Sequence, residues 1–186
     1  LRAAITSANS NAAGDTIVFQ NTLSGTIALT SALPSLTDAQ GVTIDGTTAK
    51  DALTGPDIIL NGASAGSNAV GLNLQSNGNT ILGLKLTNFN GQGLIIEGSN
   101  NKVGGTGARD RNVFLSNAGA CCTGQVKIQS GSNSQIMGNY IGLDSDGTTA
   151  GGDPGTAVSM AGTGTNNILG GTTTAHRNVI VGGGNG

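Results

Sequence analysis

A five-residue pattern recurs four times along the chain and constrains the fold more than any other feature. The pattern is Asn or Ser, any residue, an aliphatic residue, any residue and Gly, and it begins at Asn79, Asn101, Ser134 and Asn167. The starts are separated by 22, 33 and 33 residues. A longer match pairs residues 100–106 and 111–114 with 166–172 and 177–180 at a constant offset of 66 residues. Repetition at a fixed period is typical of proteins built from stacked structural units.

A unit of 22 residues has room for three short strands and three corners, which make one coil. The coils of 33 residues have room for extra loops, which we expect at 106–110, 118–123 and 144–155. The apolar interior of a single coil is covered only when the next coil stacks on it, with strands pairing in parallel at ~4.8 Å per coil. The pattern therefore predicts an all-β parallel β-helix of roughly six to seven coils with three short strands each.

Composition supports short strands with tight corners. Short runs of Val, Ile and Thr alternate with Gly and Asn, including one apolar run at 82–86 that we expect to be a single strand. Gly and Asn tolerate positive φ at corners. Asn repeated at one corner can also form a ladder of stacked amides. We expect such a ladder from Asn79, Asn101 and Asn167, interrupted by Ser134.

The first residues follow a different pattern. Leu1, Ala4, Ile5 and Ala8 fall on one face of a helix. We therefore expect a capping helix and lead-in at 1–13, which would cover the first coil, and β-helix coils over 14–186. No comparable cap follows the apolar segment 177–181, so we expect the coils to continue beyond Gly186 in a parent protein.

Several segments resemble bacterial right-handed parallel β-helix repeat proteins whose N-terminal cap carries a Ser-Leu-Arg-Glu-Ala-Ile type motif. The resemblance implies a right-handed, single-stranded β-helix in a secreted or cell-surface protein, with Ala3 in place of the motif's Glu. The matching residues are Leu1-Arg2-Ala3-Ala4-Ile5, Gly14-Asp15-Thr16-Ile17-Val18-Phe19, Val42-Thr43-Ile44-Asp45-Gly46, Gly138-Asn139-Tyr140-Ile141-Gly142 and Arg177-Asn178-Val179-Ile180.

Catalytic chemistry has few candidate residues. Polysaccharide hydrolysis needs two or three neighbouring carboxylates, whereas the ten acidic residues of this chain do not repeat at equivalent positions of successive coils. Asp110 and Arg111, with Lys85 or Lys127, are the remaining candidates for a pectate-lyase-like reaction. The chain has no Trp, which argues against sugar binding by aromatic stacking. The sequence favours a protein that is not an enzyme and leaves the alternative open.

The sequence offers candidates for three other kinds of site. Asp144 and Asp146, with Asp153 beyond them, are the candidate ligands for Ca²⁺, or alternatively form an Asp-Gly turn in a surface loop. Cys121 and Cys122 are unpaired thiols, a strained bond between neighbours or a cross-link to another chain. Threonine pairs and a triplet could support an ice-binding face, although they lie in loops of differing register: Thr47-Thr48, Thr148-Thr149 and Thr172-Thr173-Thr174.

These observations favour a structural or adhesive rod segment of an extracellular protein, able to self-associate into filaments or to contact the remainder of its parent chain. Carbohydrate-active or carbohydrate-binding and ice-binding proteins are the second and third alternatives. The net charge of −2 supplies no basic face for nucleic acid, and no apolar run reaches the ~18 residues that a membrane span requires.

Overall fold

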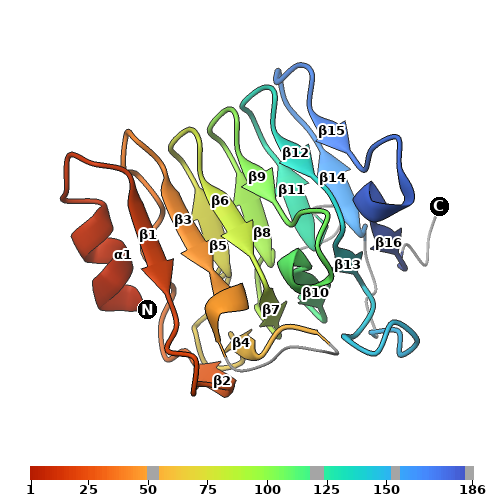
Figure 1. Ribbon diagram of the computed structural model, residues 1–186, viewed down its shortest axis with the longest axis horizontal. Coiled ribbons are helices and arrows are strands. Elements are labelled where there is room, and N and C mark those ends of the chain that lie inside the picture. Colours follow the sequence, from red (N-terminus) through yellow and green to blue (C-terminus); the bar gives the residue numbers. More distant parts are fainter. Residues whose placement is uncertain (50–54, 118–123, 152–155, 183–186) are drawn as a thin grey trace.

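The computed structural model describes residues 1–49, 55–117, 124–151 and 156–182. Over these residues the chain forms short strands in three parallel sheets, together with one α-helix and three 3₁₀ helices (Figure 1). The 3₁₀ helices are η1 (Gly46–Thr48), η2 (Ala108–Asp110) and η3 (Thr174–His176). The prediction of a mostly β protein with parallel pairing and a short N-terminal helix is confirmed.

The three sheets are named A, B and C. In spatial order, sheet A contains β1 (Asp15–Val18), β3 (Val42–Asp45), β6 (Thr80–Leu82), β9 (Lys102–Val103), β12 (Gln135–Ile136) and β15 (Ile168–Leu169). Sheet B contains β2 (Gly25–Ala28), β4 (Ile58–Asn61), β7 (Leu84–Thr87), β10 (Val113–Leu115), β13 (Tyr140–Ile141) and β16 (Val179–Ile180). Sheet C contains β5 (Leu72–Leu74), β8 (Leu94–Ile96), β11 (Val126–Ile128) and β14 (Val158–Met160).

The chain passes through sheets A, B and C in a repeating order, and one such passage is called a circuit below. The first circuit contains β1 and β2, and the second begins at β3. Each strand inside a sheet pairs with the equivalent strand of the circuits before and after it, as β6 does with β3 and β9, and the strands at the sheet ends pair on one side. The first circuit has no named strand in sheet C, where Leu36 forms a parallel bridge with Leu74. The strands of each sheet therefore lie side by side in order of sequence (Figure 1).

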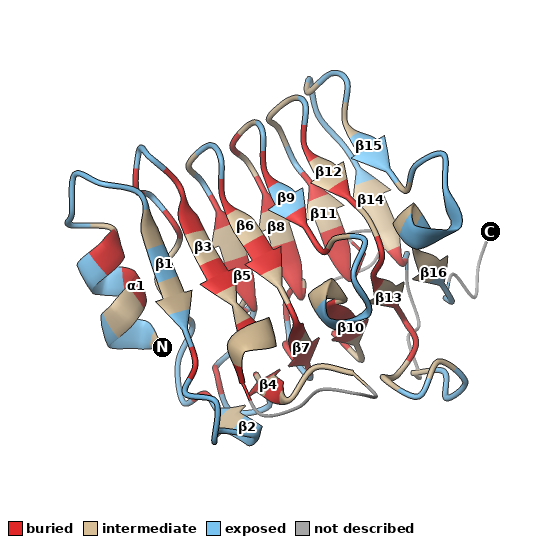
Figure 2. Ribbon diagram, in the orientation of Figure 1, coloured by how far each residue is buried: buried red, intermediate tan, exposed pale blue. Residues whose placement is uncertain are grey.

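Apolar side chains of equivalent strand positions line up inside the molecule. In sheet A, Ile44, Ile81, Val103 and Ile136 occupy one register position and have no exposed surface. Their strand neighbours point outward, because successive side chains of a strand alternate between its two faces. Burial is therefore concentrated on the middle strands of each sheet, and the exposed residues lie at the corners and at the two ends (Figure 2).

Asparagine and glycine form the corners. The six non-glycine residues with positive φ among the described residues are Ser116 and five asparagines: Asn68, Asn88, Asn100, Asn133 and Asn166. Gly83, with φ of +64°, turns the chain from β6 in sheet A to β7 in sheet B. The prediction of one strand over 82–86 is therefore wrong, because a glycine corner divides this apolar run between two sheets.

Helix α1 (Arg2–Ala8) lies beside β1 at one end of the sheets (Figure 1). Ile5 and Ala8 are buried in the core, and Leu1 packs against it. The Arg2 guanidinium donates to the carbonyl oxygens of Ala32 at 2.7 Å and Ser31 at 2.8 Å. The helix therefore covers the interior of the first circuit and is fastened to a later loop.

We expect Ile81→Ala to lower the free energy of unfolding by roughly 2–5 kcal/mol, because it removes a fully buried side chain between two other circuits. Urea unfolding followed by circular dichroism measures this change. Thr80→Ala, on the outward face of the same strand, is the matched control and should change stability by about 0.5 kcal/mol or less. Equal effects of the two substitutions would contradict the assignment of inward and outward faces.

Candidate functional site

The first ladder consists of Asn79, Asn101, Ser134 and Asn167, each immediately before a strand of sheet A. Asn101 Oδ1 accepts hydrogen bonds from the backbone N–H of Asn79 at 2.8 Å and from Asn79 Nδ2 at 2.9 Å. Ser134 Oγ accepts from the Asn101 N–H at 3.2 Å, and Asn167 Oδ1 accepts from the Ser134 N–H at 2.9 Å. The structure thus places the predicted ladder residues in one row that links four circuits.

The amide nitrogens of the first ladder hold the corners. Asn101 Nδ2 donates to the Gly98 carbonyl at 2.8 Å, and Asn79 Nδ2 donates to the Ser76 carbonyl at 2.8 Å. Asn79, Asn101 and Ser134 have no exposed surface. Their side chains therefore provide hydrogen-bond partners for backbone groups that water cannot reach. Their role in the described structure is to satisfy buried backbone groups.

A second ladder, which the sequence analysis missed, consists of Asn112, Asn139 and Asn178 before strands of sheet B. Asn139 Oδ1 accepts from the Asn112 N–H at 3.0 Å, and Asn178 Oδ1 accepts from the Asn139 N–H at 3.0 Å. Asn112 Oδ1 accepts from the Leu84 N–H at 3.0 Å. The signal was present, because each of these asparagines immediately precedes an apolar strand.

Asp110 and Arg111, the candidate catalytic pair, face different partners. Asp110 Oδ2 accepts from the Gly107 N–H at 2.9 Å. The Arg111 guanidinium lies over the ring of Tyr140, 4.0 Å from its centroid, and its Nε donates to the Gly138 carbonyl at 3.3 Å. Asp110 therefore stabilises its own turn, and Arg111 connects this circuit to the next.

Lys85, one of the two candidate bases, is paired with a candidate Ca²⁺ ligand. Its Nζ lies 2.6 Å from Asp144 Oδ1. Partial burial raises the pKa of Asp144, but the hydrogen bonds from Lys85 and from the Ser145 backbone and the charge of Lys85 outweigh it and lower the pKa below 3.8. The other candidate base, Lys127, lies in β11 of sheet C, between Ile95 and Ser159 of the neighbouring strands.

Asp146 is engaged within its own loop. Its Oδ2 accepts from the Thr149 hydroxyl, and its Oδ1 accepts from the backbone N–H groups of Thr148 and Thr149, both at 2.8 Å. These hydrogen bonds lower its pKa to about 2. Asp153 lies outside the described residues. No group of three or more His, Cys, Asp or Glu side chains suited to a metal ion occurs in the described part of the chain.

The threonine candidates are divided among local turns. Thr47 and Thr48 donate to the carboxylate and the carbonyl of Asp45, and Thr172, Thr173 and Thr174 line a hollow at the end of the sheets. An in-register threonine row does occur elsewhere, on the outward face of sheet A, where Thr16, Thr43 and Thr80 are aligned. The row ends there, because Lys102 and Gln135 occupy the next positions.

A groove lies on the outward face of sheet A, beneath the loop that contains η2. It has a volume of about 300 Å³ and is lined by Thr80, Leu82, Lys102, Asp110 and Gln135, among others. Lys102 is exposed, and no carboxylate of the described residues forms an ion pair with it. The groove combines the cationic Lys102, the anionic Asp110, several hydrogen-bonding groups and an aliphatic wall.

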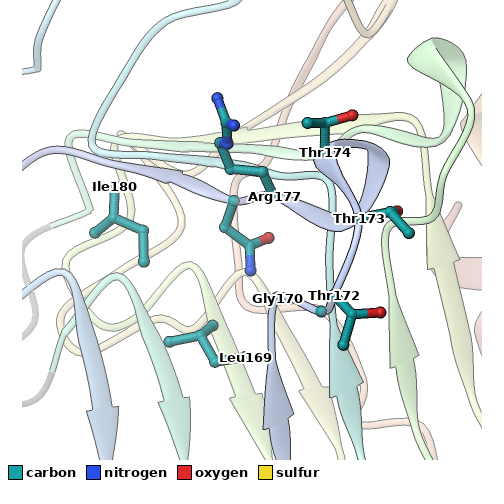
Figure 3. Close-up of a pocket in the computed structure, with 9 residues that line it drawn as sticks. Leu169, Gly170, Thr172, Thr173, Thr174, Arg177 and Ile180 are labelled. Atoms are coloured by element: carbon teal, nitrogen blue, oxygen red, sulfur yellow. The ribbon is translucent and has the colours of Figure 1, made fainter.

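The end of the sheets farthest from α1 is called the open end and consists of β14, β15 and β16. A hollow of about 440 Å³ there is lined by Leu169, Arg177, Asn178, Ile180 and the loop 170–174, and Figure 3 shows these side chains. Leu169 is 39% exposed, although Ile136 at the equivalent position of the preceding circuit is fully buried. The open end therefore presents core positions to solvent.

Cys121 and Cys122 lie outside the described residues. The described residues contain no helix that is long and apolar enough to cross a membrane. No family model, curated protein or solved structure matches this chain.

We expect Asn101→Ala to destabilise the protein by about 3 kcal/mol, since it leaves the Asn79 N–H and amide and the Gly98 carbonyl without their partner and each unsatisfied buried group costs roughly 1–3 kcal/mol. Equilibrium unfolding in urea tests this expectation. Asn90→Ala, at an exposed corner position, is the control and should have little effect. A similar small effect for Asn101→Ala would show that the ladder does not contribute to stability.

Because the pKa of Asp146 is lowered from 3.8 to about 2 in the folded protein, its carboxylate stabilises the fold above pH 3.8. This contribution should disappear as the pH falls from 3.8 through about 2, where the folded form also becomes protonated. We expect wild-type protein to lose more stability than Asp146→Asn over this range, as measured by thermal unfolding at a series of pH values. Parallel curves for the two proteins would refute the loop hydrogen bonds.

Proposed function

We propose that this chain is a segment of a right-handed, single-stranded parallel β-helix that acts as a structural or adhesive rod in an extracellular or cell-surface protein. The order in which the chain visits sheets A, B and C supports this architecture, because each circuit stacks on the one before it. A stack of this kind is lengthened by adding circuits, which suits a domain that separates or supports other domains of a protein.

The observation that carries the proposal is the pair of ladders. In both rows a side-chain oxygen of one circuit accepts a hydrogen bond from the backbone of the preceding circuit. Polar side chains that could perform chemistry have structural partners instead. Asp110 and Asp146 accept from backbone N–H groups of their own turns, and Arg111 donates to the Gly138 carbonyl of the next circuit. The specific polar interactions of the described residues therefore connect circuits and hold turns, as expected for a protein with a structural role.

The extracellular assignment is supported by the resemblance of residues 1–19 to a secreted family's cap motif. The contacts of this segment fit a capping role, because Arg2 fastens α1 to residues 31 and 32 and Ile5 is buried. The low content of charged residues, 10%, agrees with a stack held together by aliphatic packing and amide hydrogen bonds.

A carbohydrate-binding rod is the second candidate, and the groove on sheet A favours it. Lys102 can pair with the carboxylate of an acidic sugar, while Gln135, Thr80 and Asp110 can bind hydroxyl groups. The groove contains no aromatic platform, so this binding would depend on polar contacts.

Duplicating one complete circuit tests the structural role. A second copy of residues 79–100, inserted after residue 100, should fold and should raise the urea m-value by about a tenth, because an added circuit buries additional surface. The matched control is an insertion of the same 22 residues in scrambled order, which should lower stability. Loss of folding with both insertions would contradict the stacked architecture.

Assays against pectins, alginate and other glycans, with and without Ca²⁺, test the alternative. We expect no turnover. Binding that Lys102→Ala abolishes would favour the carbohydrate-binding rod. Turnover that Asp110→Ala or Arg111→Ala abolishes would show that the protein is an enzyme.

A further inference from the structure

A hairpin that follows β13 folds back over the outward face of sheet B. It comprises residues 143–151 and is called the strap below. Leu143 and Ala150 form the antiparallel bridge at its base, and the Asp144 N–H donates to the Thr149 carbonyl at 2.8 Å. The strap is therefore a closed hairpin with backbone hydrogen bonds of its own.

The strap reaches past the adjacent circuit to the one beyond it. β7, β10 and β13 are neighbouring strands of sheet B and belong to the third, fourth and fifth circuits. Lys85, Val113 and Tyr140 occupy one register position on these strands. Asp144 follows the fifth circuit's β13, and its Oδ1 lies 2.6 Å from Nζ of Lys85 in the third circuit. An ion pair therefore joins two circuits whose strands do not pair with each other.

The outward face of β10 is buried where it lies between these two circuits. Phe114 points into the core, so its strand neighbours Val113 and Leu115 point outward. Val113 nevertheless has no exposed surface, and Leu143 at the base of the strap is 5% exposed. Neither of these two residues belongs to the main core. Apolar side chains are therefore buried on both faces of sheet B at this position.

Two glycines allow the strap to lie close to the sheet. A Cβ on Gly151 would lie 2.5 Å from Cδ1 of Leu115, and a Cβ on Gly147 would lie 3.0 Å from the hydroxyl oxygen of Tyr140. Gly147 also has a φ of +71°, which glycine adopts at little cost. The backbone of the strap therefore packs directly against residues of the fourth and fifth circuits.

We propose that the strap locks the third, fourth and fifth circuits into one unit that opens as a whole. In a stack whose interfaces involve only neighbours, circuits can separate one at a time. Here the fifth circuit separates from the fourth only if the Lys85–Asp144 pair breaks and Val113 is uncovered. The strap depends only on the strand order of the three sheets, so its test is separate from the circuit duplication that tests the structural role.

Amide hydrogen exchange of the 186-residue chain, measured by mass spectrometry of its peptides, tests the proposal. Lys85→Met removes the charge and keeps the aliphatic stem, and Asp144→Asn is nearly isosteric. Each should accelerate exchange in residues 134–143 of the fifth circuit by roughly two- to fivefold, the range for a partly exposed ion pair. The double variant should exchange no faster than either single variant. Residues 42–48 of the second circuit should exchange at the wild-type rate.

Asp110→Asn is the matched control, because this carboxylate accepts from Gly107 within its own turn. It should leave exchange in residues 134–143 unchanged. Wild-type exchange rates in both strap variants would show that the ion pair does not hold the fifth circuit. Equal acceleration in 42–48 and 134–143 would show a general loss of stability in place of a lock on particular circuits. Additive effects of the two single substitutions would show that Lys85 and Asp144 act separately, and each of these results would overturn the inference.

Discussion

The rest of the structure depends on one constraint, which is that a single circuit cannot bury its own interior. Each passage of the chain through the three sheets leaves apolar side chains that only the strands of the neighbouring circuits cover. The fully buried row of Ile44, Ile81, Val103 and Ile136 shows this closure repeated through sheet A. The protein is therefore stabilised by similar interfaces in series between adjacent circuits, and the Lys85–Asp144 ion pair adds a contact between circuits that are not adjacent.

The two ladders satisfy backbone groups that become buried when circuits stack. Corners place backbone N–H and C=O groups inside the molecule, where an unsatisfied group is costly. An asparagine can satisfy both kinds of backbone group, because its side-chain oxygen accepts a hydrogen bond from an N–H of the preceding circuit and its amide nitrogen donates to a nearby backbone carbonyl. Asn101 and Asn139 both act in this way. The most regular polar residues of the chain are thus explained by architecture.

The sequence allowed prediction of the parallel strands, the N-terminal helix and the positions of Asn79, Asn101 and Asn167, because these features repeat or follow a clear periodicity. It did not allow prediction of the corner at Gly83, since an apolar run with one glycine reads as a single strand. The second ladder was missed although Asn112 and Asn178 share the 66-residue offset of Asn101 and Asn167, because Asn139 lies 27 and 39 residues from them and breaks the regular spacing. The pairing of Lys85 with Asp144, 59 residues away, depends on how a loop folds back and leaves no local pattern.

The loop that contains Asp144 and Asp146 indicates where this chain can accept inserted sequence. Leu143 and Ala150 form an antiparallel bridge that closes this loop at its base. Asp144, just beyond the bridge, is held by its ion pair with Lys85 of β7. Thr148 and Thr149, nearer the tip of the loop, are exposed. Loop tips of this kind accept new sequence readily. The exposed tip of this loop is consequently the position where an unrelated peptide could be displayed while the three sheets are left intact.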